Sequence, residues 1–341
     1  MRTVRKCVRF GIVAGAGAIG LMAAPMYGQT CTTQARMQPA VRQALADAAL
    51  AIGSAVKAGD PATVKAATVP ELAANFGSTE FLIRSTSQKL SGETLRVTQV
   101  YELDATARKA GDASSADFSC ALKDTSSETD FSISGLPPGD FGFAMVETSG
   151  GEHPWLLSLL LQREGSAWKM AGFYPKARSA AGHDGLWYWN AARQRAGAKE
   201  ALLSWLYYSQ AETLLQPAPF ADSTNLDKLR NEQRGVAPPE IAGGLSAATP
   251  MVLKGAGGSE FKVISLGTET ATDDKSLHLL MHVAGVAGAD EAVLRGRGEG
   301  AARALVAAHP ELKQAFGAVY VFTDLPQGNA PVVSLTMTQI Q

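Results

Sequence analysis

The sequence predicts an α+β protein built from two α+β layers that are joined by a helical connector. Over residues 38–57, apolar residues recur every three or four positions, which is the period of an amphipathic helix. Later segments alternate apolar and polar residues, as half-buried strands do. A block of helices followed by a run of long strands is the order of a domain whose helices cover one face of an antiparallel sheet. The alternating pattern returns at Phe261, which predicts the second layer.

The first 28 residues have the layout of a secretory signal peptide. Basic residues with no acid among them precede an apolar run at 10–24 that is interrupted by glycines. This run is shorter than the ~20 residues that span a bilayer. Small residues favour cleavage after Gly28, with Ala24 as the second choice. We therefore expect an exported protein, periplasmic or extracellular, with no membrane span in the mature chain.

Composition and charge exclude some classes of partner. The whole chain has 31 Lys+Arg and 32 Asp+Glu, and removal of the four basic residues at 1–28 leaves a net charge of about −5. Neither sign forms a long run, so nothing in the mature chain attracts nucleic acid. With 46% hydrophobic and 18% charged residues the chain is globular. About 310 mature residues are enough for two domains with separate cores.

Two cysteines, Cys31 and Cys120, remain after cleavage. In an oxidising compartment such a pair can form a disulfide. The bond would close a loop of about 90 residues, worth ~4.5 kcal/mol in the chain-entropy account. The alternation of Phe118, Cys120 and Leu122 with other residues equally fits a free cysteine that faces a core. The sequence leaves both possibilities open.

The first domain is expected at 38–178. Its leading helix covers 38–57 and ends at Gly59, after which Asp60 caps a second helix that has Pro61 at its first position. A third short helix opens at Pro70, and a fourth covers about 79–90. Strands are expected at 95–103, 118–122, 131–134, 141–147, 155–161 and 167–174. The turn at 163–166 makes the last two a hairpin.

The leading helix, the Gly59-Asp60-Pro61-Ala62 joint and the closing strand at 168–175 resemble the nuclear transport factor 2-like superfamily. The resemblance covers residues 38–178 and implies a cone-shaped fold with a pocket. That superfamily includes ketosteroid-isomerase-like enzymes as well as ligand-binding and purely structural members. It therefore implies a fold and a pocket, but no particular activity.

A connector follows at 184–232, with helices at 186–195 and 199–215 that meet at Gly197. Its tryptophans and tyrosines resemble a tetratricopeptide-type hairpin over 186–217, but there is no second copy, and one repeat makes no solenoid. We expect these aromatic side chains to pack on a neighbouring domain, with a peptide-binding hairpin as the alternative. A polar linker is expected between Pro217 and Pro239.

The C-terminal domain at 240–341 resembles no family. Strands are expected at 261–266, 277–283, 319–323 and 332–339, with a helical stretch at 290–316 that Pro310 breaks. Its Gly296-Arg297-Gly298-Glu299-Gly300 run, with Arg295 before it, suits either an anion site at a helix start or a flexible break.

Two motifs resemble a nucleotide site and a metal site, but their positions in the chain argue against both functions. Gly15-x-Gly17-x-x-Gly20 matches a dinucleotide fingerprint, but it lies in the signal segment with no strand before it. His278 and His282 fall on a strand, where positions four apart are about 13 Å from each other, too far for one zinc ion. We therefore expect no cofactor and no metal.

Catalytic signatures are also missing. The chain has no Gly-x-Ser-x-Gly elbow and no cysteine matched to a histidine. An isomerase-like cone needs a carboxylate and a tyrosine that face its pocket. Strand alternation places Tyr101 inward with Leu95, Val97 and Leu103, which puts Glu102 and Asp104 on the opposite face. The pocket is therefore expected to be apolar, with Tyr101, Trp168 and Met170 as candidate lining residues.

Taken together, these features predict a non-catalytic exported protein of the bacterial envelope. It would bind a small apolar ligand in its cone or an envelope protein partner. The alternative is a ketosteroid-isomerase-like or hydratase-type enzyme that uses the cone pocket.

Overall fold

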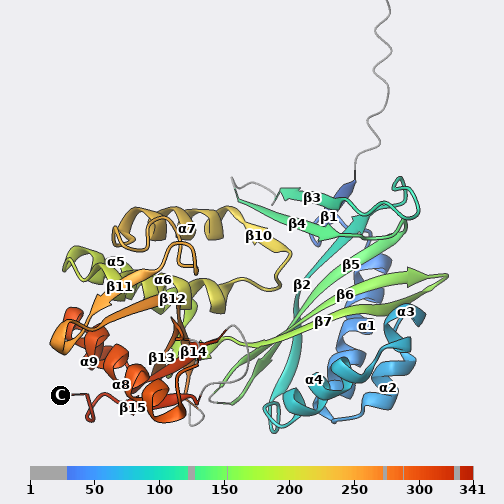
Figure 1. Cartoon of the computed structure of the whole chain (residues 1–341). Coiled ribbons are helices and arrows are strands. Elements are labelled where there is room, and N and C mark those ends of the chain that lie inside the picture. The colour runs from blue at the N-terminus through green and yellow to red at the C-terminus, as the bar shows by residue number, and fades with distance from the viewer. Residues whose placement is uncertain are drawn as a thin grey trace, which may run out of the picture.

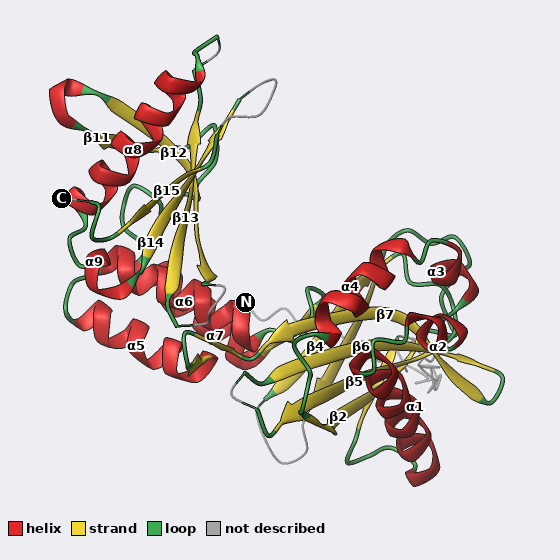
Figure 2. Cartoon of the chain, turned by 90° about the horizontal axis from the view of Figure 1, so that it is seen from below, coloured by secondary structure: helices red, strands yellow, loops and turns green. Residues whose placement is uncertain are grey.

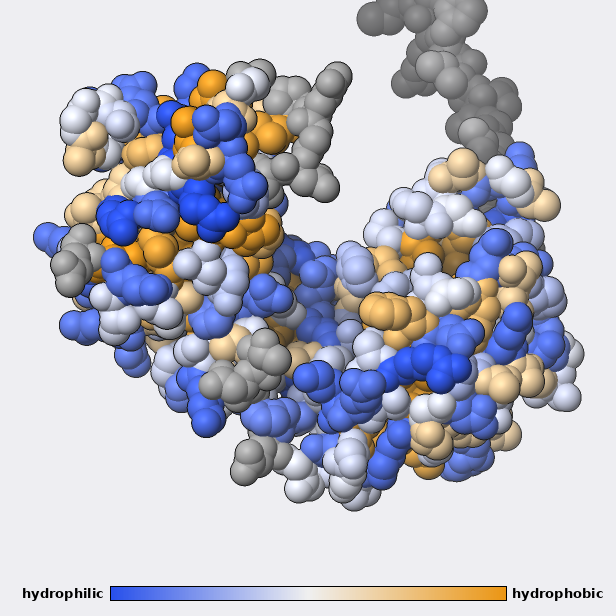
Figure 3. Space-filling view, turned by 60° about the horizontal axis from the view of Figure 1, so that its bottom comes forward, coloured by the Kyte–Doolittle hydropathy of each residue, from blue (hydrophilic) through white to orange (hydrophobic). Residues whose placement is uncertain are grey.

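The structure is a computed structural model that describes residues 29–121, 127–151, 153–271, 275–286, 288–325 and 331–340. The expected signal segment at 1–28 lies outside these residues. Two lobes make up the molecule, a blue-to-green lobe and a yellow-to-red lobe (Figure 1). On the face shown in Figure 3 a notch separates them. Among the described residues, no helix combines the length and apolar character needed to cross a membrane.

The N-terminal lobe begins with its helices. These are α1 (Pro39–Lys57), α2 (Pro61–Ala66), α3 (Pro70–Ala74) and α4 (Gly77–Ser87). The first three start with proline, whose fixed φ suits the first helical turn. Gly59, at φ +65°, ends α1. Asp60 then caps α2, because its Oδ1 accepts from the backbone N–H of Thr63 at 3.0 Å.

The large sheet of this lobe is antiparallel, in the order β1-β2-β5-β6-β7. Its strands are β1 (Thr30–Thr33), β2 (Thr94–Asp104), β5 (Asp140–Ser149), β6 (Trp155–Glu164) and β7 (Ala167–Ala177). Helix α1 lies across one face (Figure 2), with Leu45, Ala49, Ile52 and Val56 buried against the strands. Gly142 of β5 permits this approach, since a Cβ there would lie 2.2 Å from Leu45 Cδ2.

A small sheet covers the other face of the large sheet. It has the order β10-β4-β3 and consists of β3 (Ser115–Ala121), β4 (Glu128–Ser134) and β10 (Ala221–Ser223). Phe131 of this sheet packs its ring against Phe143 of the large sheet, and Phe118 is buried in the same core. The N-terminal lobe is therefore a helix layer, a large sheet and a small sheet, with one core on each side of the large sheet.

Cys31 of β1 and Cys120 of β3 form a disulfide, with their Cα atoms 5.3 Å apart. Cys120 also faces the core, where it is 1% exposed. Of the two alternatives, the structure therefore has the disulfide rather than the free cysteine, and the bonded Cys120 still faces the core. The bond joins an edge strand of the large sheet to an edge strand of the small one.

The connector contains three helices, whereas two helices followed by a linker were expected. After the short strands β8 (Ser179–Ala180) and β9 (His183–Asp184) come α5 (Gly185–Gly197), α6 (Ala201–Leu215) and α7 (Thr224–Val236). The expectation of a polar linker at 217–239 was wrong, because most of this segment forms β10 and α7. Ser223 caps α7 by accepting from Leu226 N. Leu226 and Leu229, three apart, supply its narrow buried stripe.

The C-terminal lobe has a mixed five-stranded sheet in the order β11-β12-β13-β14-β15. Its elements are β11 (Met251–Lys254), β12 (Glu260–Thr270), β13 (Leu277–Ala284), α8 (Glu291–Ala308), α9 (Leu312–Ala315), β14 (Ala318–Asp324) and β15 (Val333–Thr336). Strands β13 and β14 are parallel, since α8 carries the chain between them, and the other pairs are antiparallel. Tyr188, Tyr207 and Tyr208 of the connector share one core with this sheet.

Candidate functional site

The structure does not bring the three candidate pocket residues together. Trp168 and Met170 of β7 lie in the core beneath the helices, whereas Tyr101 lies in the core beneath the small sheet. The cause is a register shift of β2 between Val97 and Gln99, which inserts Thr98 as an extra residue. Leu95 and Val97 face the helices as expected, but the face assigned to Tyr101 and Leu103 was wrong.

The same bulge places Glu102 on the helix side. Glu102 is in register with Gly142, which contacts α1. Burial raises the pKa of the Glu102 carboxyl, and the Asp140 carboxylate raises it further. Asp104, at the end of the strand, is exposed and accepts from Thr106 N at 2.8 Å. The acid that faces the helices is therefore Glu102, contrary to the expectation that both acids lie outside the cone.

The region beneath the helices is a packed core. Met170 is fully buried and Trp168 is 8% exposed. Leu45, Ile83 and Leu157 are among the side chains that pack into the same core. Tyr101 is packed as well, with its ring 5.1 Å from that of Phe131 and its hydroxyl 3.2 Å from Thr129 Oγ1. The sequence-predicted residues thus serve in two cores on opposite sides of the large sheet.

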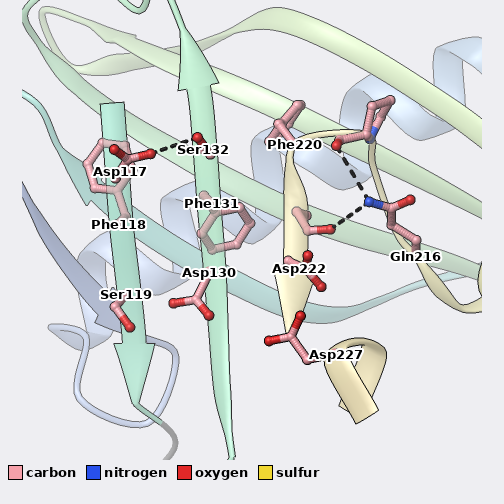
Figure 4. Close-up of a pocket in the computed structure, with 12 residues that line it drawn as sticks. Asp117, Phe118, Ser119, Asp130, Phe131, Ser132, Gln216, Phe220, Asp222 and Asp227 are labelled. Carbon is pink, nitrogen blue, oxygen red and sulfur yellow. Dashed lines mark hydrogen bonds between the residues drawn. The ribbon is translucent and has the colours of Figure 1, made fainter. Parts of the chain in front are cut away.

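A surface hollow of about 500 Å³ lies instead over the outer face of the small sheet (Figure 4). Strand alternation produces this face: Phe118 and Phe131 point inward, so their neighbours point outward. The register places Asp130 of β4 between Ser119 of β3 and Asp222 of β10. We call the four carboxylates that line this hollow the acidic face: Asp117, Asp130, Asp222 and Asp227.

The charges of the acidic face are only partly compensated. Asp117 accepts from Ser132 Oγ at 2.6 Å. Arg230 of α7 forms ion pairs with Asp222 and, at 3.7 Å, with Asp227. Its guanidinium is shared with Glu212 at 2.6 Å. Two of the four carboxylates, Asp222 and Asp227, therefore share one cation with Glu212.

Asp130 and Asp222 stand directly opposite each other on neighbouring strands. Like charges in this position destabilise a strand pair. Within the described residues no ion pair involves Asp130. An apolar ledge, Pro219 and the partly buried ring of Phe220, adjoins these acids. The arrangement suits a positively charged group that carries an apolar stem.

The two histidines lie on a strand, β13, as expected. His278 packs against the ring of Tyr320, and His282 stacks on Phe322 while its Nδ1 lies 2.9 Å from Asp324 Oδ1. In the described part of the chain, no group of three or more His, Cys, Asp or Glu side chains is placed to hold a metal ion.

Sequence reasoning did not identify the acidic face. Alternation around Phe118 and Phe131 was a sufficient signal for Asp117 and Asp130 to point outward. No local signal pairs β10 with β4, because about 90 residues separate them in the chain. The opposition of Asp130 and Asp222 is visible only in the fold.

Comparisons of the chain with family models, with curated proteins and with solved structures gave no match. We therefore infer function from the residues, burial and charges of the chain itself.

Proposed function

We propose that the protein is a non-catalytic binding module of the bacterial envelope, and that its acidic face binds a cationic segment of an envelope protein partner. The opposition of Asp130 and Asp222 carries this proposal. Arg230 pairs with Asp222, but Asp130 faces Asp222 across the strands with no ion pair of its own among the described residues, and like charges in this position cost stability. A lysine or arginine of a partner supplies a cation for Asp130, and its methylene stem can lie on Phe220.

Export is the second part of the proposal. It is supported by the signal-like segment at 1–28 and by the Cys31–Cys120 disulfide, since disulfides persist in oxidising compartments. The third part is a relationship of residues 38–178 to the nuclear transport factor 2-like superfamily. The leading helix α1 on a curved antiparallel sheet and the closing strand β7 support it. A small apolar ligand in the cone is less well supported, because large side chains fill that core.

The test uses the Asp130→Asn variant, which removes charge without breaking a native ion pair. Binding of a fluorescein-labelled oligolysine peptide is measured by fluorescence anisotropy at low salt. We expect the variant to bind at least about threefold more weakly, while its fold becomes more stable by about 0.5 kcal/mol as the repulsion is relieved.

Glu240→Gln is the matched control, because Glu240 is exposed and its loss makes the same change in net charge. It is expected to bind like the wild type. Equal weakening in both variants, or no binding by the wild type, would show that the acidic face is only a solvated surface.

Glu102 supports a second candidate function, an isomerase-type enzyme. Burial raises the pKa of the Glu102 carboxyl, which is the direction of change that general acid–base catalysis by a carboxyl requires. Its assay is the conversion of an unconjugated ketosteroid to the conjugated enone, followed by ultraviolet absorbance. Turnover that Glu102→Gln abolishes and Asp104→Asn preserves would replace the binding proposal.

A further inference from the structure

A trough of about 520 Å³ runs between α8 and the turn that joins β11 to β12 in the C-terminal lobe. One face of α8 forms one wall, through positions three or four residues apart between Val293 and Ala307. The facing wall comes from Lys254, the glycine-rich turn that follows it, and Phe261. We call this feature the α8 trough.

The glycine run predicted to start or break a helix lies inside α8, which continues through it. Two of its glycines are explained by packing. A Cβ on Gly300 would lie 2.7 Å from the Phe261 ring, and one on Gly298 would lie 2.8 Å from Val333. Gly296 differs, because no atom lies within 4 Å of its Cβ position. Glycine is unfavourable inside a helix, and packing does not require one at position 296. The missing side chain at Gly296 keeps the trough open.

Three cations line the α8 trough: Lys254, Arg297 and Arg303. Arg297 is held in place, since its Nη2 donates to the Glu260 carbonyl at 3.2 Å and its guanidinium carbon lies 5.5 Å from the Phe261 ring centre. Arg303 forms an ion pair with Glu299 at 3.2 Å.

Lys254 has no ion pair with any described residue, although Glu260 is its cross-strand neighbour. Positive charge therefore exceeds the negative charge paired with it in the trough.

We propose that the α8 trough binds a small anionic ligand that carries phosphate or carboxylate groups. The volume falls within the range of small-molecule sites. Cations reach the trough from two elements, β11 and α8, so they can contact separate oxygens of one anion. The guanidinium groups of Arg297 and Arg303 suit bidentate contacts with either oxyanion. The aromatic ring of Phe261 and the small residues of α8 leave an apolar floor for the rest of the ligand.

This site is separate from the acidic face, which lies on the other lobe and has the opposite charge. The two proposals therefore fail independently. The sequence alone pointed to an anion at a helix start, whereas the fold places Arg297 in the middle of α8 and adds Lys254 from a distant strand.

The test is calorimetric titration of the whole mature protein with inorganic pyrophosphate and, separately, with citrate. We expect at least one anion to bind, and the tighter of the two identifies phosphate or carboxylate as the preferred group. Lys254→Gln should weaken that binding about tenfold, the loss expected for one charge-assisted contact. Lys254 makes no ion pair within the described structure, so its replacement leaves the fold intact.

Two further variants separate the trough from general charge. Arg295→Gln removes one positive charge, as Lys254→Gln does, but Arg295 pairs with Glu291 outside the trough. The Arg295→Gln variant should therefore bind the anion as tightly as the wild type. Gly296→Trp keeps every charge and fills the open space, so it should abolish binding while circular dichroism shows an unchanged fold. The proposal is overturned if neither anion binds, if Arg295→Gln weakens binding as much as Lys254→Gln, or if Gly296→Trp binds normally.

Discussion

Glu232 of α7 is the most heavily used carboxylate of the connector. It accepts from Trp189 Nε1 at 2.8 Å, from Arg193 Nε and Nη2 at 2.8 and 2.9 Å, and from the Tyr208 hydroxyl at 3.2 Å. These donors come from α5 and α6, so one side chain joins three helices. The hydrogen bonds from Arg193 and Trp189 lower the pKa of Glu232 to about 2.

The magnitude of this contribution follows from the pKa change. A fall from 4.5 to about 2 corresponds to an upper value of about 3.4 kcal/mol. The Glu232 side chain is 27% exposed and that of Arg193 43%, so solvent screening reduces the effect to about 1–2 kcal/mol. Because the folded pKa is the lower one, the stabilisation is present above pH 4.5 and is lost as the pH falls towards 2.

Glu232→Gln should therefore reduce the free energy of unfolding by about 1–2 kcal/mol at pH 7, measured by urea denaturation. At pH 3 the difference from the wild type should shrink to about half or less, since the unfolded state has already bound the proton there and folding must release it. Glu240→Gln, at an exposed position four residues after α7, is the control and should change little at either pH. A Glu232→Gln loss that is the same at pH 7 and pH 3 would refute the assignment to the carboxylate charge.

Three other outcomes are expected. Replacing both Cys31 and Cys120 by Ala should lower the free energy of unfolding by about 4 kcal/mol, because the disulfide spans 89 residues. A loss below about 1 kcal/mol in urea denaturation would contradict this. Gly142→Ala should cost about 1–3 kcal/mol by thermal unfolding, because its Cβ would meet a buried leucine of α1, whereas Gly267→Ala, with open space, should be nearly neutral. Burial lowers the pKa of Lys176 from 10.5 to about 8, so between pH 8 and 10.5 the unfolded state binds a proton that the folded state has released. The wild type should therefore gain stability relative to Lys176→Met as the pH rises through that window. A difference in the free energy of unfolding that stays constant in urea denaturation would contradict this.

Local patterns in the sequence predicted the individual elements well. The proline and glycine positions around Gly59 and Pro61 predicted where α1 ends and α2 begins, and Pro310 separates α8 from α9. Alternation predicted that His278 and His282 lie on a strand. These features depend on residues close together in the chain, which is why the sequence alone contains them.

Long-range pairing produced the errors. One extra residue, Thr98, reversed the face of every later position of β2, and no composition signal marks such a bulge. Segment 217–239 looked like a linker because β10 has three residues and α7 buries a narrow stripe. The boundary expected between 232 and 240 stays a prediction, although the connector shares its core with the C-terminal sheet.

The contribution of β10 to the small sheet affects the order in which the protein can mature. The chain is synthesised from its N-terminus, so both cysteines emerge about 100 residues before Ala221. The disulfide can therefore close while the third strand of the sheet is still absent and one edge of β4 lacks its partner. Unpaired strand edges promote aggregation. An N-terminal fragment that ends near residue 178 should for this reason be less soluble than one that extends through Ser223.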